Sequence, residues 1–159
     1  MDYNWNWGVL FQDPFFDWLV LGVQWTFAVA LAAWVIALSV GVLVGVGRTL
    51  PSKPISLICT AYVELFRNVP LLVQMFLIYY GVGQFEIIRT SIFWTVLKSP
   101  FWCAIIALTL NTTAYGSEII RGGLASVQFV EVEAARAFGM SGFLLFRRII
   151  FPIAIRKYY

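Results

Sequence analysis

The chain has 159 residues, of which 61% are hydrophobic and only 12% are charged, and its formal net charge is +3. Soluble domains carry about 25% charged residues, so this composition excludes an ordinary soluble enzyme and favours a helical protein of the bilayer. The net charge is small and gathered in short segments, which argues against nucleic-acid binding.

The first predicted element is a membrane-spanning helix over residues 18–47, a stretch without any charged residue. A helix of that length rises about 45 Å, enough to cross a hydrocarbon core of about 30 Å with some tilt. We do not expect a cleaved signal peptide, because residues 1–17 contain no Lys or Arg and signal peptides begin with basic residues. Gly41 and Gly45 form a G-x-x-x-G pair, which predicts close packing against another helix.

A second span is predicted over residues 57–82, and it carries the polar side chains Glu64, Arg67 and Gln74. A charge at the centre of a spanning helix costs roughly 2.5–3.5 kcal/mol, so such residues need a partner or a wet cavity. Two interpretations stay open: Glu64 and Arg67 pair on one helix face, or these side chains line a path. Pro70 also frees a backbone carbonyl, which is tolerated only where protein or water satisfies it.

A third span is predicted over residues 100–118, and its second half is polar. Asn111, Tyr115 and Glu118 fall on one helical face by the 3.6-residue period, with Thr112 beside Asn111. These side chains either line a translocation path or form hydrogen bonds to neighbouring helices.

Loop charges predict the orientation of the three spans. Residues 1–17 contain no Lys or Arg and residues 83–100 contain two, whereas residues 47–56 and 119–159 together contain eight. Because basic loops stay in the cytoplasm, we expect the N-terminus outside and the last segment inside.

The last segment is predicted to form two short helices that meet at a glycine corner. Glu131 near the start of the first helix and Arg136 near its end follow the order that a helix dipole favours. Gly139 stands where a left-handed residue ends a helix, and Ser141 is a candidate N-cap for a second helix. Pro152 is expected to stop that second helix. By charge alone, a solvated surface hairpin and a docking element explain this segment equally well.

No transition-metal site is expected, because the chain has no His and only two cysteines. Cys59 and Cys103 lie in or beside apolar runs, which favours small buried thiols rather than a disulfide. No nucleophile and base combination occurs either, so no catalytic residues are assigned, and no phosphate-binding loop of the G-x-x-x-x-G-K-[ST] type is present.

Three stretches together resemble one family. Residues 133–152 read E-A-A, three residues, Gly, nine residues and I-I-F-P, which resembles the EAA loop of ATP-binding-cassette (ABC) importer permeases. Residues 64–74, with the pattern E-x-x-R-x-x-P-L-L-x-Q, and residues 114–123, with A-Y-x-x-E-x-x-R-G-G, resemble the polar amino-acid subfamily. The resemblance covers roughly residues 19–158. It departs from that subfamily at Val130-Glu131, where Gly-Gln is common.

The resemblance implies an all-α, polytopic transmembrane protein, namely a type I ABC importer permease core lacking its last two spans. Residues 1–159 would be a single partial permease domain with a cytoplasmic EAA coupling loop over residues 119–159. The implied function is that of a permease subunit of an amino-acid importer, of the glutamate/aspartate type by similarity, in the bacterial inner membrane.

The resemblance also implies sites and partners. The substrate-path candidates are Glu64, Arg67, Gln74, Asn111, Thr112 and Tyr115, and the ATPase-coupling candidates are Glu133, Ala134, Ala135, Gly139, Ile149 and Pro152. The expected partners are a cytoplasmic ABC ATPase dimer that carries ATP and magnesium, a second permease subunit, a periplasmic amino-acid-binding protein and membrane lipid. The alternatives are a non-transporting membrane assembly or regulatory protein and an inactive shortened permease.

Overall fold

The computed structural model describes residues 6–158, and every regular element within that range is helical. The prediction of an all-α protein is therefore confirmed. The elements in chain order are η1 Trp7–Phe11, α1 Phe15–Gly47, α2 Lys53–Asn68, α3 Leu71–Phe76, η2 Leu77–Gly81, η3 Val82–Gln84, α4 Glu86–Arg89, α5 Trp94–Leu97, α6 Pro100–Ala125, α7 Phe129–Ala137, α8 Gly142–Leu145, η4 Phe146–Ile150 and α9 Phe151–Tyr158.

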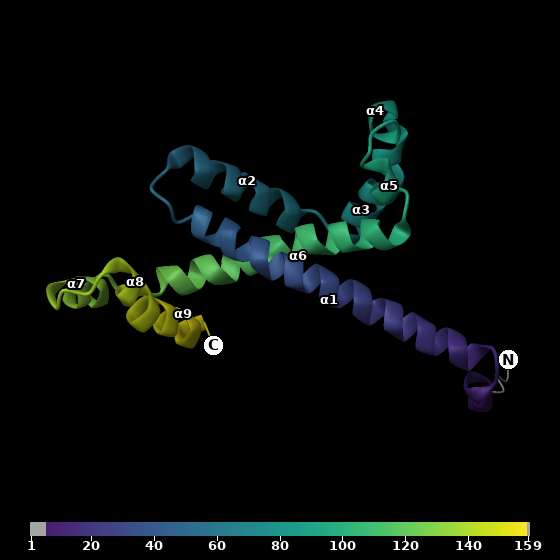
Figure 1. Cartoon of the computed structure of the whole chain (residues 1–159), viewed down its shortest axis with the longest axis horizontal. Helices are drawn as coiled ribbons and strands as arrows, with labels where there is room; N and C mark the ends of the chain where they lie inside the picture. Colours follow the sequence, from purple (N-terminus) through teal and green to yellow (C-terminus); the bar gives the residue numbers. More distant parts are fainter. Residues whose placement is uncertain (1–5, 159) are drawn as a thin grey trace.

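Two long helices, α1 and α6, form the centre of the molecule and share its most extensive interface (Figure 1). Helix α2 lies beside both of them, the short helices α4 and α5 lie near the start of α6, and α7, α8 and α9 lie at its other end (Figure 1). The two ends of α6 therefore carry two separate sets of short helices.

The interface between α1 and α6 is built on small residues. Every fourth residue along one side of α1 is buried: Ala33, Ala37, Gly41 and Gly45. A Cβ atom placed on Gly45 would lie 2.9 Å from the main-chain oxygen of Ser117, so only glycine fits there. Thr113 donates a hydrogen bond of 3.5 Å to the carbonyl of Ala37 across the same interface. The predicted close packing at Gly41 and Gly45 is confirmed, since small residues let two backbones approach.

The stretch predicted as one span over residues 57–82 is broken in the structure. Helix α2 ends at Asn68, and the segment from Leu71 to Gln84 continues at an angle of 101° to it. Pro70 explains the break, because a proline has no N–H to donate and its ring pushes the preceding residue out of the helical region.

Within the described residues, two helices are long and apolar enough to cross a membrane, Phe15–Gly47 and Pro100–Ala125. The broken pair of α2 and the following segment provides a third crossing only if it counts as one bent span. The predicted helices over residues 18–47 and 100–118 are thus present, and α6 runs seven residues further than expected, to Ala125. The three-span topology stays a prediction.

Pro152 does not end the helix in which it stands, contrary to the prediction. Helix α8 passes directly into a π-helical turn over Phe146–Ile150 and then into α9, where Pro152 is the second residue. A widened turn before the proline accommodates the ring and the missing N–H that would break a regular α-helix.

Candidate functional site

Four charged side chains meet where α1, α2 and α6 come together, and we call this group the arginine junction: Arg48, Arg67, Glu118 and Arg121. The Oε1 atom of Glu118 lies 2.5 Å from Nη1 of Arg48 and 3.2 Å from Nη1 of Arg67. Its Oε2 atom accepts hydrogen bonds from Nε and Nη2 of Arg121, at 3.1 and 2.9 Å. One carboxylate thus holds three helices through three guanidinium groups.

The chain places each member of the junction at the end of an apolar stretch. Arg48 directly follows α1, Arg67 occupies the last turn of α2, and Arg121 stands one turn after Glu118 on α6. The guanidinium group of Arg67 also lies 5.5 Å from the ring centroid of Tyr115, which is a favourable cation–π geometry.

Of the two interpretations left open for Glu64 and Arg67, the pair on one helix face does not form. Glu64 is exposed and makes no ion pair within residues 6–158, whereas Arg67 turns to Glu118 on α6. The cross-helix partner wins because a pair held between packed helices, with Glu118 only 20% exposed, is less screened by solvent than a pair on an open helix face.

A second polar group holds the break between α2 and α3. Pro70 leaves the carbonyl of Phe66 without its usual donor four residues later, and two side chains replace that donor. Gln74 donates to this carbonyl at 2.8 Å and Asn111 donates to it at 3.3 Å. Gln74 also donates to the carbonyl of Val69 at 2.8 Å. The expectation that protein groups satisfy the carbonyl freed by Pro70 is confirmed.

Of the path candidates, Gln74 and Asn111 meet at this break, while Arg67 and Tyr115 lie against each other at the arginine junction. Gln74 is 4% exposed, and its Oε1 atom is buried without a hydrogen-bond partner in the described part of the chain. Asn111 and Thr112 are half-buried on α6, and Tyr115 is exposed beneath Arg67. Gln74 and Asn111 therefore have a structural role as helix-bridging side chains, which was one of the two interpretations of Asn111 left open above.

The second candidate site is the segment Phe129–Leu145, which comprises α7, α8 and their connection, and we call it the coupling element. The main-chain N–H of Gln128 donates to the Glu131 carboxylate at 3.0 Å, an arrangement that satisfies a free donor at the start of α7. The departure from the family pattern at Val130-Glu131 thus gives the helix a self-contained beginning.

Gly139 forms the corner of the coupling element as predicted. Its φ angle is +74°, the only positive φ among the described residues. The N–H of Gly139 donates to the main-chain carbonyl of Arg136 at 2.9 Å, and the N–H of Met140 donates to the main-chain carbonyl of Ala135 at 3.2 Å. These two bonds are those of a Schellman motif, in which glycine is preferred because its left-handed conformation costs nothing sterically.

The coupling candidates divide into exposed and buried side chains. Glu133 and Ala134 are exposed on α7, while Ala135 is 4% exposed and faces the chain itself, where α7 contacts α8 and η4. Ile149 is half-buried in the π-helical turn and Pro152 is exposed at the start of α9. The exposed face of α7 is therefore available to a partner, and the Ala135 side chain is not.

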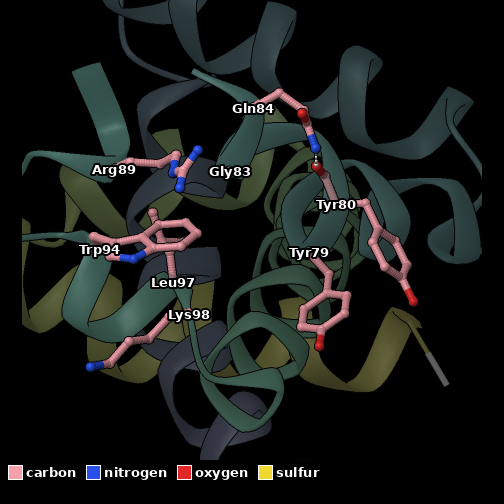
Figure 2. A pocket seen from close by; sticks show the side chains of 8 residues that line it. All are labelled: Tyr79, Tyr80, Gly83, Gln84, Arg89, Trp94, Leu97 and Lys98. Carbon is pink, nitrogen blue, oxygen red and sulfur yellow. Dashed lines mark hydrogen bonds between the residues drawn. The ribbon is translucent and has the colours of Figure 1, made fainter. Parts of the chain in front are cut away.

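An open hollow of about 380 Å³ lies between the segment after α3 and helix α5, near the start of α6. Figure 2 shows Tyr79 and Tyr80 on one side of it and Arg89, Trp94 and Lys98 on the other. A Cβ atom on Gly83 would lie 3.0 Å from the Trp94 ring, so the indole lies directly against this glycine. Neither Arg89 nor Lys98 has an ion pair in the described residues, which leaves two free positive charges at the hollow.

Sequence reasoning placed Glu118 on a polar face but missed its role as the centre of the junction. Arg48 is 70 residues away in the chain, so no local spacing could reveal the pair. The signal was the presence of an ionisable residue inside an apolar helix, which demands a partner. No group of three metal-ligating side chains occurs among residues 6–158.

Residues 37–158 match a family described as binding-protein-dependent transport system inner membrane component. The nopaline transport system permease protein of Agrobacterium fabrum is 48% identical over 143 residues, which are 89% of this chain and 59% of the relative. The octopine transport system permease protein of Rhizobium meliloti is 56% identical over 96 residues, which are 60% of this chain and 39% of the relative. A histidine/lysine/arginine/ornithine transport system permease protein of Escherichia coli K12 is 40% identical over 135 residues, covering 80% of this chain and 57% of the relative.

One solved structure has the same fold. It is described as a crystal structure of an amino acid ABC transporter with histidines, and it superposes with a TM-score of 0.75 at 31% identity, over 99% of this chain and 68% of that one. The predicted type I permease architecture is thereby confirmed. The chain spans less than two thirds of the length of each curated relative named above.

Proposed function

The chain belongs to the family of binding-protein-dependent transport system inner membrane components, and we propose that it acts as a membrane-spanning permease subunit of an ABC importer for amino acids. The relatives and the solved structure, all named as transporters or their permeases, support this assignment. ATP hydrolysis belongs to a separate ATPase in this proposal, and the chain supplies helices that line the path and receive the motion of that ATPase.

The coupling element is the observation that carries the proposal. A motor outside the membrane acts on the spans only through a rigid contact, and α7 is fixed at both ends, by Gln128 and Glu131 at its start and by the Gly139 corner at its end. Its exposed Glu133 and Ala134 offer a charge and a small side chain that permits close approach. We assign ATPase contact to this face, with Gly139, Ile149 and Pro152 fixing the geometry behind it.

Orientation and the remaining partners follow from the same proposal. The eight basic residues of the segments 47–56 and 119–159 favour a cytoplasmic coupling element and a periplasmic N-terminus. The hollow beside Arg89 then lies on the periplasmic side, where a substrate-binding protein approaches. A second permease subunit completes the path to which Gln74, Asn111, Thr112 and Tyr115 contribute.

We propose a polar amino acid or an opine as the cargo. The relatives described above are named for nopaline, octopine and the basic amino acids histidine, lysine, arginine and ornithine, and none of these three is named for glutamate or aspartate. We therefore favour basic amino acids or opines over the acidic cargo that the sequence resemblance implied. Uptake of labelled arginine, octopine and glutamate by the assembled transporter distinguishes these classes.

Gly139→Val tests the coupling role. Apart from the adjacent residues, no atom lies within 4 Å of a Cβ built on Gly139, so the substitution acts by opposing the positive φ, at a cost of about 1–2 kcal/mol and more for a β-branched side chain. We expect the variant to insert into membranes normally, to lose co-purification of the ATPase and to abolish uptake.

Gly142→Ala is the matched control, because it also meets no atom within 4 Å and its backbone has no positive φ. Normal ATPase association in Gly139→Val would refute the docking role. ATPase association without uptake in the unchanged, fully assembled complex would instead favour the non-transporting assembly protein.

A further inference from the structure

The arginine junction is electrically unbalanced. Three guanidinium groups surround the single carboxylate of Glu118, so two positive charges remain in excess. No other carboxylate lies within 4.0 Å of these arginines among residues 6–158, and the nearby Glu64 on α2 makes no ion pair. An uncompensated charge in a membrane-spanning segment is costly, and an anion bound at this point lowers that cost.

The three arginines differ in how far the protein uses their donors. Arg48 is 10% exposed and donates to both Glu118 and Thr60. Arg121 donates twice to Glu118, and its side chain is 42% exposed. The side chain of Arg67, also 42% exposed, makes no hydrogen bond within the described residues and meets Glu118 only as an ion pair at 3.2 Å. Since a guanidinium group has five N–H donors, Arg67 and Arg121 present most of the free donors on the open side.

One aromatic ring lies directly against these free donors. Tyr115 on α6 is 49% exposed, and the Arg67 guanidinium group lies 5.5 Å from the centroid of its ring. Glu118 and Arg121 lie seven and four residues before the end of α6 at Ala125, that is about 10 and 6 Å along the helix axis. In a helix that crosses a membrane, the last two turns lie near the boundary between hydrocarbon and headgroups.

We propose that Arg67 and Arg121 bind the phosphate of an anionic phospholipid, with an acyl chain against Tyr115. Guanidinium groups bind phosphate oxygens in a bidentate manner, and the predicted cytoplasmic leaflet is the one rich in anionic lipid. A lipid is favoured over a free phosphate ion because Arg121 stands near the end of α6, a helix long and apolar enough to cross a membrane. The choice of leaflet rests on the proposed orientation of the chain, but the site does not depend on the ATPase contact.

The test is lipid binding to the detergent-solubilised chain, measured by native mass spectrometry. The probes are dioleoyl phosphatidylglycerol, dioleoyl phosphatidylcholine and inorganic phosphate. We expect phosphatidylglycerol to bind in preference to phosphatidylcholine, and millimolar phosphate to leave it bound. Arg67→Gln and Arg121→Gln should each weaken phosphatidylglycerol binding about 10-fold, as expected when a charge-assisted hydrogen-bonding partner is lost.

Arg89→Gln is the matched control, since it removes an exposed arginine near the other end of α6 and should leave the affinity unchanged. Three results would each overturn the proposal: equal binding of both lipids, unchanged phosphatidylglycerol binding in a variant that carries both Arg67→Gln and Arg121→Gln, or displacement of phosphatidylglycerol by inorganic phosphate. Loss of phosphatidylglycerol upon addition of a second permease subunit would assign the site to that subunit's acidic side chains instead. If a variant loses its helical circular dichroism, the comparison of the two lipids on the unchanged chain still decides whether the chain prefers the anionic lipid.

Discussion

The arginine junction and the coupling element lie at opposite extremes in how they are held. The junction is fixed by side chains from three helices, with Arg48 10% exposed and every carboxylate oxygen of Glu118 paired. The coupling element is fixed by its own backbone, through two hydrogen bonds at the Gly139 corner and one at the start of α7. Its exposed side chains have few contacts with the rest of the chain.

The junction therefore belongs to the internal architecture, whereas the coupling element presents an outward-facing surface. A junction built on ion pairs between helices fails when its central charge is removed, because Arg48, which is 10% exposed, then stays without compensation. An element built on local backbone geometry keeps its shape when exposed side chains change, and so can vary its surface for a partner. The following substitutions challenge this contrast, beginning with the largest expected effect.

Glu118→Gln should destabilise the packing of α1, α2 and α6 most. Glutamine keeps the size of the side chain but leaves Arg48, which is only 10% exposed, without its carboxylate partner, and breaking such a pair typically costs about 3 kcal/mol or more. The free energy of unfolding measured by SDS titration in mixed micelles should fall by that amount. The exposed Glu64, which has no ion pair in the described residues, supplies the control, and Glu64→Gln should change stability by less than about 0.5 kcal/mol. Similar effects of the two substitutions would mean that the junction does not hold the helices.

Gly45→Val should have the next largest effect, of about 1–3 kcal/mol, as is usual for overpacking. Its Cβ would lie 2.9 Å from both the Ser117 main-chain oxygen and Ile120, so α1 and α6 must move apart. Gly22→Val on the same helix meets nothing within 4 Å and should leave stability nearly unchanged. Disulfide trapping between cysteines placed at positions 37 and 113 reports the separation directly. Equal trapping in both variants would contradict the packing described for this interface.

Much of this architecture could be predicted from local sequence. The uncharged run of α1, the spacing of Gly41 and Gly45 and the left-handed Gly139 are each determined by neighbours in the chain or by the conformational freedom of glycine. Local rules also identified the carbonyl freed by Pro70, though not the donors, Gln74 and Asn111, that satisfy it.

The predictions that failed depended on contacts between distant segments. Glu64 and Arg67 have favourable spacing on one helix, but Arg67 instead pairs with a carboxylate on α6 that the chain brings close only after folding. Pro152 was expected to stop a helix, yet the π-helical turn before it absorbs the proline. Ala134 and Ala135 were both coupling candidates, but the fold of the coupling element exposes Ala134 and buries Ala135.

Photo-crosslinking from single cysteines tests most directly the claim that the coupling element is the ATPase contact. In a background without Cys59 and Cys103, a benzophenone maleimide is attached at Ala134→Cys on α7 or at Leu65→Cys, an exposed position on α2. We predict that illumination of the complex joins position 134, but not position 65, to a subunit whose peptides contain a phosphate-binding loop. Absence of that adduct at position 134, or an equal yield at position 65, would contradict the account.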